Sequence, residues 1–331
     1  MKEEDIRPSH LHEKYLRLSK EDAKLFFSDN SRWQQIPCPA CSSSAVENCF
    51  VKDGFGYVEC CDCGSLYQSP RPSIEEFEQF YIDSPSSNYW AEEFFPKIAE
   101  ARRELIFRPR VKKISEYCDD KNIPHNTIVD VGAGFGIFLD EWRNQHPDDS
   151  LCAIEPGKKL AQACRDKKIE TLEVLAEHAQ NWNEKGDLVT CFEVIEHVHS
   201  PISFIESLKM LTKPGGHVLV SGLGVDGYDI QVLWNESKSI SPPHHINFMS
   251  VQGFELLFER AGFKDVDVIT PGQLDVEIVN KALDSNPELA KQNRFATFLS
   301  NCNDQVQNEF QEFLQRNRMS SHVWIFAKRA E

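Results

Sequence analysis

The stretch Ile128-Val-Asp-Val-Gly-Ala-Gly-Phe-Gly136 decides the fold class of this chain. It runs from a short apolar segment into three closely spaced glycines. The amphipathic pattern of Ile137, Phe138, Leu139 and Trp142 follows directly. This order predicts a buried strand, a tight turn and a helix. Glycines remove side chains where the backbone has to approach a ligand, so we predict a binding site on the turn.

Further apolar runs of the buried-strand type follow along the chain. They lie at 151–154, 187–192, 217–221, 266–269 and 323–327, and helical patterns fill the intervals between the first four strand segments. Strands that alternate with helices indicate βαβ units and a mostly parallel sheet. The expected fold class is therefore α/β.

The glycine spacing favours one kind of ligand over another. The dinucleotide fingerprint is G-x-G-x-x-G, whereas the third glycine here comes one residue early. Asp130 also precedes the turn, where a carboxylate would repel a pyrophosphate but can anchor a cationic amino acid portion. Glu155, at the tip of the next strand, is placed to accept both hydroxyls of a ribose. Sites for NAD and for S-adenosylmethionine (SAM) both use an acid in that role, so Glu155 does not distinguish the two cofactors. The alternative is that Glu155 is a solvent-exposed acid of the loop.

Four cysteines ahead of this region form two pairs with metal-ligand spacing. Cys38-Pro-Ala-Cys41 and Cys60-Cys-Asp-Cys63 are both C-x-x-C pairs, and the interval between them fits a zinc site. Four thiolates close a tetrahedral shell, which is typical of structural zinc. Cys61 is a possible substitute for Cys60, although only Cys60 keeps the spacing. A redox pair or four unrelated buried thiols are the alternatives.

Composition limits the function classes. The net charge is −16, which disfavours binding to a phosphate backbone, so we expect no nucleic-acid partner. No apolar run has the length of a membrane span, and the charged N-terminus lacks a signal-peptide pattern. We therefore expect a cytoplasmic protein that does not insert into membranes. The oligomeric state is not predicted.

Taken together, these motifs resemble the class I S-adenosylmethionine (SAM)-dependent methyltransferases. The matching residues are DVGAGFG at 130–136, Glu155, GDLVTCFEVIEHVHSP at 186–201, LTKPGGHVLVSG at 211–222 and AGF at 261–263. With the four-cysteine module ahead of them, the layout is similar to zinc-ribbon methyltransferases that act on modified sugars and surface polysaccharides.

The resemblance implies a Rossmann-like sheet of seven strands whose last strand is antiparallel. It implies SAM as the cofactor, with Glu155 and the adjacent Pro156 at its ribose and Glu177 in the segment that usually touches adenine. Phe192 and Glu193 would lie beside the cofactor. The residues expected around its amino acid portion are Asp130, Gly132, Ala133, Gly134 and Gly136.

The segment Glu193-Val-Ile-Glu196-His197 permits two interpretations. In the first, Glu196 and His197 face the substrate or fix the loop beside SAM. In the second, Glu193, Glu196 and His197 bind a divalent metal together with His244 or His245. That set resembles the metal-dependent small-RNA 2′-O-methyltransferases, since carboxylate and imidazole groups hold such ions.

The loop Pro242-Pro-His-His-Ile-Asn-Phe-Met-Ser250 supplies two further candidates. An imidazole near SAM can remove the acceptor's proton as the methyl group transfers. We predict His245 as the general base, His244 as the second choice, and His197 or Glu196 next. The alternative is that the loop histidines hold backbone groups.

These patterns divide the chain into four parts. We expect a helical segment at 1–35, the zinc-ribbon module with structural Zn²⁺ at 36–71, a helical linker or substrate cover at 72–118, and the methyltransferase domain at 119–331. A helical insert at about 272–319 would also cover the substrate.

The predicted function is methylation of a small molecule, with a nucleotide-linked sugar or a glycan precursor for surface polysaccharide as the acceptor. Three alternatives stay open. They are a metal-dependent RNA 2′-O-methyltransferase, an NAD-dependent sugar oxidoreductase or epimerase, and a non-enzymatic zinc-ribbon adaptor with a vestigial SAM fold.

Overall fold

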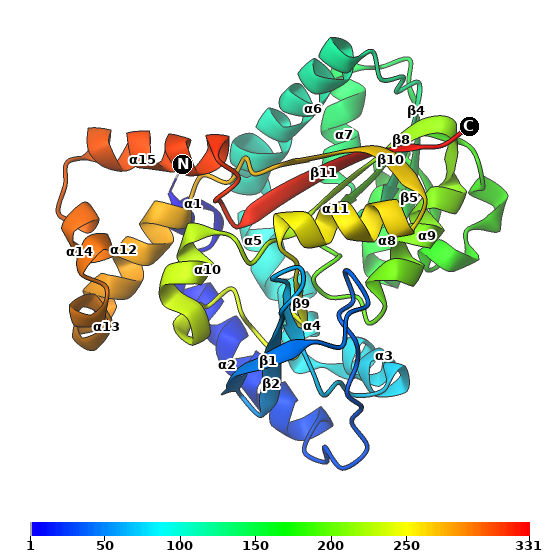
Figure 1. Cartoon of the computed structure of the whole chain (residues 1–331). Coiled ribbons are helices and arrows are strands. Elements are labelled where there is room, and N and C mark those ends of the chain that lie inside the picture. The colour runs from blue at the N-terminus through cyan, green and yellow to red at the C-terminus, as the bar shows by residue number, and fades with distance from the viewer. Residues whose placement is uncertain (1) are drawn as a thin grey trace.

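A computed structural model describes residues 2–331 of the chain. The molecule has a large seven-stranded sheet, a small four-stranded sheet and a group of helices to one side (Figure 1). The strand order of the large sheet is β10-β11-β8-β7-β4-β5-β6. Its strands are β4 (Thr127–Val131), β5 (Ser150–Ile154), β6 (Glu170–Leu172), β7 (Gly186–Phe192), β8 (Thr212–Leu223), β10 (Phe263–Ile269) and β11 (His322–Arg329).

The sheet confirms the predicted α/β class and the antiparallel last strand. β4 pairs in parallel with β5 and β7, and parallel pairing continues from β5 to β6 and from β7 to β8. β11 is antiparallel to both β8 and β10, between which it lies. The parallel strands therefore end at the same edge, where β11 begins.

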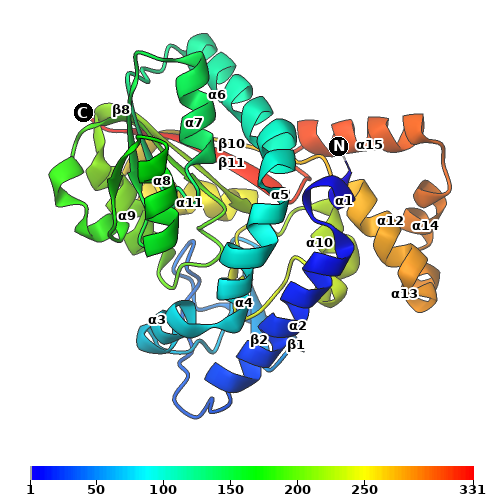
Figure 2. The same ribbon diagram turned by 180° about the vertical axis from the view of Figure 1, so that it is seen from behind.

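Side chains of successive strand residues enter two different cores. Val129 and Val189 join the core beneath α9 (Pro201–Leu211) and α11 (Val251–Arg260). Their neighbours Ile128 and Leu188 join the opposite core, beneath the helices α6 (Arg108–Lys121), α7 (Ile137–Gln145) and α8 (Lys158–Asp166), which lie in front of the sheet in Figure 2. Burial on both faces explains why most residues of these strands are apolar.

The N-terminal helices pack against one another and against the small sheet. α2 runs alongside α4 and the helical segments that follow it (Figure 2). The elements of this region are α1 (Glu3–Ile6), α2 (Ser9–Phe26), α3 (Ile74–Asp83), α4 (Pro85–Tyr89), the π-helical turn Trp90–Phe94, α5 (Phe95–Arg102) and the π-helical turn Arg103–Phe107.

The cysteine-rich segment folds into the small sheet, whose order is β1-β2-β3-β9. β1 (Val46–Lys52) and β2 (Phe55–Cys60) form a hairpin, and β3 (Leu66–Gln68) pairs with β2. The fourth strand, β9 (Asn247–Phe248), comes from the His-His loop far along the chain and pairs with β3. The loop is thus joined to the cysteine module by main-chain pairing.

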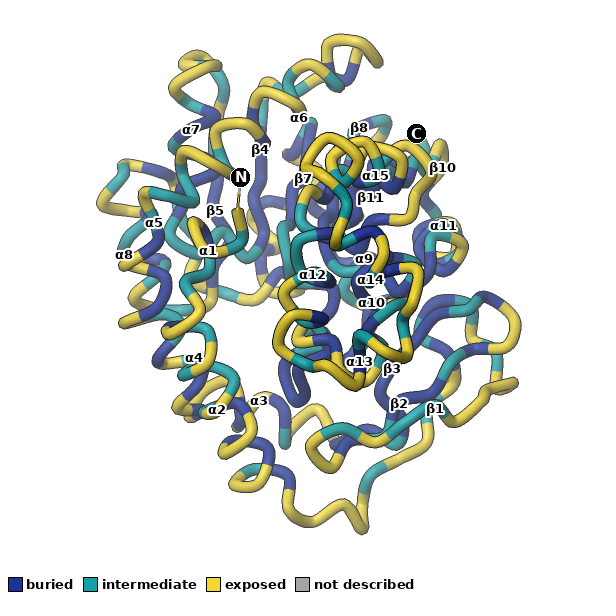
Figure 3. The backbone as a smooth tube through the Cα atoms, turned by 90° about the vertical axis from the view of Figure 1, so that its left-hand side faces the viewer, coloured by how far each residue is buried: buried dark blue, intermediate teal, exposed yellow. Residues whose placement is uncertain are grey.

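The remaining helices lie beside the large sheet. They include α12 (Asp275–Ser285), α13 (Pro287–Gln292), α14 (Arg294–Ser300) and α15 (Asp304–Arg316), which lie to one side of the sheet in Figure 1. In Figure 3 they face the viewer, and many of their residues are coloured as exposed. They pack on α10 (Tyr228–Leu233). Short 3-10 turns occur at Ala176–His178, Gln180–Trp182 and Trp234–Glu236. Within residues 2–331, none of the helices has both the length and the apolar character that a bilayer crossing needs.

Candidate active site

The site lies where the carboxyl ends of the parallel strands meet, the usual place for ligands in open α/β sheets. The turn after β4, the acid after β5 and the segment after β7 all reach this edge. His322 reaches the same edge, because it begins the antiparallel β11 and pairs with Leu223 at the end of β8.

The glycine turn after β4 requires its glycines. Gly132, Gly134 and Gly136 all have left-handed φ angles, at 70°, 55° and 66°. A Cβ atom on Gly132 would lie 2.8 Å from a methyl carbon of Val194, and one on Gly136 would lie 2.9 Å from the sulfur of Cys164. A Cβ atom on Gly134 would meet nothing within 4 Å among the described residues, so the middle of the turn faces open space.

Asp130 is buried at the end of β4. Its carboxylate accepts a hydrogen bond of 2.7 Å from the hydroxyl of Thr190 on β7. Burial raises the pKa of Asp130 to about 7, although the Thr190 hydrogen bond and the charge of Arg110 oppose that shift. A cation placed beside this carboxyl would favour its ionised form.

Glu155 connects two turns through its carboxylate. One oxygen accepts the amide N–H of Gly134 and the other accepts that of Gly157, both at 2.8 Å. The side chain is buried, and burial raises its pKa. Each carboxylate oxygen keeps a further lone pair, so the group can still accept two hydroxyls of a ribose.

These residues fit the SAM molecule that the sequence predicts here. The open space over Gly134 and the strand-end acid Glu155 lie on adjacent turns, which is the arrangement that a nucleoside with an amino acid portion needs. Ala133 is partly buried within the turn, whereas Pro156 and Glu177 are exposed. The assignment of individual contacts to these residues stays a prediction.

Glu193 joins a polar network after β7. Its Oε1 accepts hydrogen bonds from Ser221 at 2.5 Å and from His322 at 2.7 Å, and Arg110 lies 3.6 Å away. Burial would raise the pKa of Glu193, but His322 and Arg110 outweigh it and hold the pKa far below its usual range. Its φ angle of 56° is uncommon for a residue with a side chain.

Glu196, His197 and His245 come together at this edge. One ligand atom from each lies within 4.8 Å of those of the other two. The loop is held against the segment after β7, because the amides of Ile246 and Asn247 both donate to the main-chain carbonyl of Glu196. Burial lowers the pKa of His197 to about 3 and of His245 to about 4, so both rings are neutral near pH 7.

His244 points elsewhere. Its Nε2 lies 2.8 Å from the hydroxyl of Ser86, and its ring packs against Tyr15 and Phe80. The side chain is only 4% exposed. The structure thus brings His245, but not His244, to Glu196 and His197.

The four predicted cysteines converge. The sulfurs of Cys38 and Cys63 lie 3.6 Å apart and those of Cys41 and Cys60 3.5 Å apart. All four sulfurs lie within 4.8 Å of one another. A tetrahedral shell with zinc–sulfur bonds of about 2.3 Å places its sulfurs about 3.8 Å apart, so this cluster fits zinc. Cys61 is exposed and stands outside it.

Each C-x-x-C pair forms the same kind of turn. The amide of Cys38 donates to Ser43, and the amide of Ser42 returns to Cys38. In the second pair, the amide of Cys60 donates to Ser65 and that of Gly64 returns to Cys60. Ser42 and Gly64 both have left-handed φ angles, 67° and 71°, which the turn demands at the residue after its second cysteine.

Arg71 ties the cysteine module to the active-site loop. Its side chain is 2% exposed and donates to the carbonyl of His199 at 2.6 Å, to that of Ile246 at 3.2 Å and to the side chain of Asn247 at 2.8 Å. Arg71 therefore spans both segments that carry the histidines of the site.

Two more arginines lie near the glycine turn. Arg110 stacks over Phe192 at 4.6 Å from the ring centroid, and its Nε is buried with no hydrogen-bond partner among the described residues. Arg102 lies over Phe95, which itself stacks on Phe135 of the turn. The Nε of Arg102 is also buried and unpartnered within that part of the chain.

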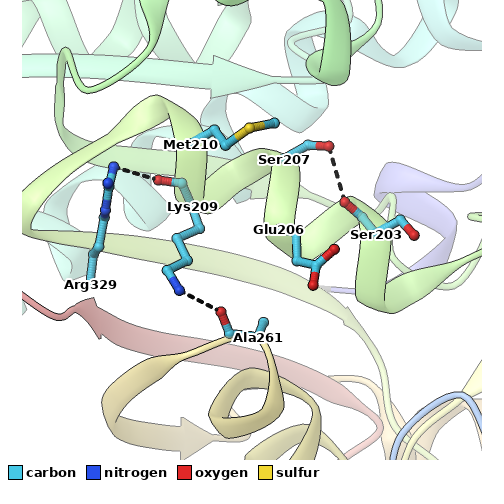
Figure 4. A pocket seen from close by; sticks show the side chains of 7 residues that line it. All are labelled: Ser203, Glu206, Ser207, Lys209, Met210, Ala261 and Arg329. Carbon is cyan, nitrogen blue, oxygen red and sulfur yellow. Dashed lines mark hydrogen bonds between the residues drawn. The ribbon is translucent and has the colours of Figure 1, made fainter.

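A separate hollow of about 470 Å³ lies at the opposite edge of the sheet (Figure 4). Lys209 donates to the carbonyl of Ala261 there, and Arg329 donates to that of Lys209. Lys209 thus joins α9 to the end of α11, and Arg329 joins α9 to β11. This hollow lies away from the glycine turn and the histidines.

Sequence reasoning missed several residues of the site. Arg71, Arg110, Ser221 and His322 were not among the predicted site residues, and neither was Thr190. Of these residues, only His322 has a local signal in the sequence. It is a histidine at the start of the last strand, and the antiparallel pairing of that strand places it at the edge of the sheet that holds the glycine turn.

Comparison with known proteins agrees with this geometry. The family model described as "Methyltransferase domain" matches residues 98–268, which is more than half of the chain. A ubiquinone biosynthesis O-methyltransferase from Aliivibrio fischeri (strain MJ11) is 37% identical over 103 residues, 29% of this chain and 43% of that protein. The enzyme of the same name from Proteus mirabilis (strain HI4320) is 32% identical over 160 residues, 46% of this chain and 62% of that protein. The chain thus spans less than two thirds of these curated relatives.

Solved structures share the fold. The plantazolicin methyltransferase BpumL, in complex with a monoazolic desmethylPZN analog and SAH (S-adenosylhomocysteine), has a TM-score of 0.50 at 15% identity. That match covers 78% of this chain and 98% of BpumL. BamL, in complex with a triazolic analog and SAH, also has a TM-score of 0.50, at 12% identity over 76% of this chain and 94% of BamL.

Proposed function

Because this chain belongs to the methyltransferase-domain family and is a SAM-dependent methyltransferase, we propose that it methylates a hydroxyl oxygen of a small anionic molecule. A nucleotide-linked sugar or a glycan precursor is the acceptor class that we favour. The observation that carries the proposal is the meeting of Glu196, His197 and His245 at the edge of the sheet that also holds the glycine turn.

SAM supplies an already activated methyl group. The chain therefore has to hold the cofactor, orient the acceptor and allow the acceptor hydroxyl to lose its proton. We assign cofactor binding to the turn at 132–136 with Asp130 and Glu155. The neutral rings of His197 and His245, beside the carboxylate of Glu196, are the groups that we assign to the acceptor hydroxyl. Oxygen as the acceptor atom is also supported by the curated relatives, which are named O-methyltransferases.

The arginines favour an anionic acceptor. A buried Nε atom without a hydrogen-bond partner is costly unless a ligand satisfies it. Arg102 and Arg110 each have such an atom within residues 2–331, although Arg110 also pairs with Glu193 through its terminal nitrogen. The carboxylate of SAM can satisfy one of them. A phosphate or a carboxylate on the acceptor would satisfy the other, because guanidinium groups match both anions in geometry.

We propose that the cysteine cluster holds a structural zinc ion. Its four sulfurs have the separation that tetrahedral zinc requires, and four protein ligands leave no open coordination position. The ion would stabilise the module at 36–71. Through β9 and Arg71, that module supports the loop that carries His245.

The helices at 72–118 and the insert at about 272–319 are proposed as the substrate cover, on the methyltransferase domain at 119–331. Phe95 and Arg102 of the first group already contact each other beside Phe135 of the glycine turn. The insert is attached to the same edge of the sheet, because Asp275 accepts the amide of Ser321, next to His322.

The test is a product screen with purified protein and SAM. The panel contains nucleotide-linked sugars, the same sugars without the diphosphate, phenolic hydroxyl compounds and a short RNA, with methyl transfer followed by mass spectrometry. We expect transfer to oxygen of an anionic sugar. Transfer to a phenolic hydroxyl instead would favour the chemistry in the relatives' names. Transfer only to nitrogen or carbon, or only to RNA, would overturn the proposal.

A further inference from the structure

The cluster of Glu196, His197 and His245 has the composition of a cation site. Two imidazoles and one carboxylate offer three ligand atoms that lie within 4.8 Å of one another. The two rings have centroids 4.7 Å apart and planes at 69°. The segments that carry them are fixed to each other by main-chain hydrogen bonds to Glu196, so the three side chains are held in place before any ion binds.

Hydrogen bonds already specify which ring nitrogen is available. Nδ1 of His197 lies 2.9 Å from the carbonyl oxygen of His244, and Nδ1 of His245 lies 2.6 Å from that of Ser239. A carbonyl only accepts, so each Nδ1 carries the proton. Nε2 of a neutral ring then has a free lone pair. Histidines that bind metals are oriented in this way, with one ring nitrogen donating to a carbonyl or a carboxylate.

The carboxylate of Glu196 lacks a partner that explains its burial. The residue is 2% exposed, and its Oε2 has no hydrogen-bond partner among the described residues. A buried, unpaired carboxylate oxygen is costly in free energy. Gly222 leaves the space around it, because a Cβ atom there would lie 3.0 Å from Oε2 and 2.6 Å from a methyl carbon of Ile195.

Other histidine and carboxylate side chains that lie close together already form hydrogen bonds with neighbouring side chains. His125 is hydrogen-bonded to Asp149 at 2.8 Å, and His146 lies 3.0 Å from the hydroxyl of Ser115. Glu193 is held by Ser221 and His322. The cluster at Glu196 differs from these groups because Oε2 of Glu196 has no hydrogen-bond partner in the part of the chain that the structure describes.

We propose that Glu196, His197 and His245 bind a divalent transition-metal ion that holds the acceptor hydroxyl for methyl transfer. Two imidazoles and one carboxylate suit ions such as Zn²⁺, Mn²⁺ or Co²⁺, and three protein ligands leave positions open for the acceptor. This inference rests on the proposed function, and it deepens that function by giving these groups a shared role.

The ion would favour loss of the acceptor proton. A hydroxyl bound to such a cation becomes more acidic, as bound water does. The acceptor O–H bond breaks and its proton passes to water. The oxygen lone pair then forms the new bond to the methyl carbon, while the carbon–sulfur bond of SAM breaks and leaves its electron pair on sulfur. The products are the methyl ether and S-adenosylhomocysteine.

The test uses Co²⁺ as the probe on the full chain, with any metal in the cysteine module left in place. Binding is followed by calorimetry and by the visible absorption of Co²⁺. We expect one Co²⁺ ion per chain beyond the metal content found on purification. Glu196→Gln and His245→Gln should each weaken Co²⁺ binding at least about tenfold, since even the groups that orient metal ligands are worth that much. His125→Gln is the matched control and should bind like the wild type.

Binding of SAM to each variant, measured separately, checks that the fold is intact. Methyl transfer should fall on brief chelation and return when a divalent ion is added. Wild-type Co²⁺ affinity in both the Glu196 and His245 variants, or no Co²⁺ bound beyond that in the cysteine module, would overturn the inference. The two proposals can fail separately. If the protein binds Co²⁺ but methylates no hydroxyl in the panel, the proposed acceptor class is wrong while the proposed metal site is supported.

Discussion

The phenol of Tyr57 donates a hydrogen bond of 2.7 Å to the main-chain carbonyl of His245. Tyr57 lies on β2 of the cysteine-containing sheet, whereas His245 lies in the loop at the end of the large sheet. The bond therefore links a residue of the cysteine module to the backbone of a proposed active-site residue.

Tyr57→Phe should lower the rate of methyl transfer with little effect on SAM affinity. The change removes one buried hydrogen bond, worth about 1 kcal/mol, and frees the loop without touching the glycine turn. We expect kcat to fall about three- to tenfold. Steady-state kinetics and calorimetry with SAM measure the two effects.

Tyr67→Phe is the matched control. Tyr67 lies on the adjacent strand β3 and is fully buried, but its hydroxyl has no hydrogen-bond partner among the described residues. Its removal should leave kcat unchanged. Equal losses in both variants would mean that the small sheet, and not the bond to His245, is responsible.

Glu155→Ala should weaken SAM binding by at least about a hundredfold. The reason is the loss of a carboxylate that can accept two ribose hydroxyls, because hydrogen bonds to charged groups contribute about 1.5–3 kcal/mol each. Calorimetry measures the affinity, and thermal unfolding checks the fold, since Gly134 and Gly157 also lose their acceptor. Glu173→Ala removes an exposed acid nearby and should change neither quantity. Unchanged SAM affinity in the Glu155 variant would remove this residue from the site.

The sequence predicts the central strands well for a physical reason. β4 and β7 are buried on both faces, so most of their residues are apolar, and this pattern is visible without the structure. β6 has no such run. Its residues Glu170–Leu172 are partly exposed at the edge of the sheet, and only the pairing with β5 makes them a strand.

Long-range contacts explain what the sequence could not predict about the site. His244 and His245 are adjacent and look alike as candidates. The hydroxyl of Ser86, 158 residues away, holds His244 outside the cluster. The carboxylate of Glu193 is held by His322, 129 residues further along the chain, and the position of Glu193 beside the cofactor stays a prediction. A local sequence pattern cannot reveal contacts between residues that are 158 or 129 positions apart.

Replacing both Cys38 and Cys60 by Ser should remove zinc and destabilise the small sheet. Structural zinc contributes directly to the folding of such modules. The loss should extend to methyl transfer, because β9 and Arg71 connect the module to the loop of His245. Elemental analysis, thermal unfolding and kcat are the three measurements.

Cys61→Ser is the control for the cysteine variants. Cys61 is exposed and adjacent to a proposed ligand, but stands outside the cluster. It should keep its zinc and its activity. Freshly purified wild-type protein without zinc, never exposed to a chelator, would contradict the proposal for this module.

The last prediction concerns a buried acid pair that joins the helical insert to the sheet. Asp229 on α10 is fully buried, and neither of its carboxylate oxygens has a hydrogen-bond partner among the described residues. Burial raises its pKa, and the neighbouring Asp275 raises it further. Asp275 itself is well satisfied, because it accepts hydrogen bonds from Gln311, Ser320 and the amide of Ser321.

A raised carboxyl pKa sets the direction of the pH effect. The folded chain holds the Asp229 proton more tightly than the unfolded chain does, where the pKa of an aspartate is about 3.9. Asp229 therefore contributes most to the free energy of unfolding at pH values below about 3.9, where it is protonated in both states. This contribution is lost as the pH rises toward the higher pKa of the folded state.

Asp229→Asn should remove this loss, because an amide stays neutral at every pH. Above neutral pH we expect the variant to be more stable than the wild type, by on the order of 1 kcal/mol for each unit by which the folded pKa is raised. Near pH 4 the difference should vanish or reverse. Urea unfolding across this range measures it, with Asp284→Asn, an exposed acid on α12, as the control. If Asp229→Asn lowers stability at every pH, the carboxylate is held by an interaction that a neutral amide cannot replace, and the pair is not the source of pH sensitivity.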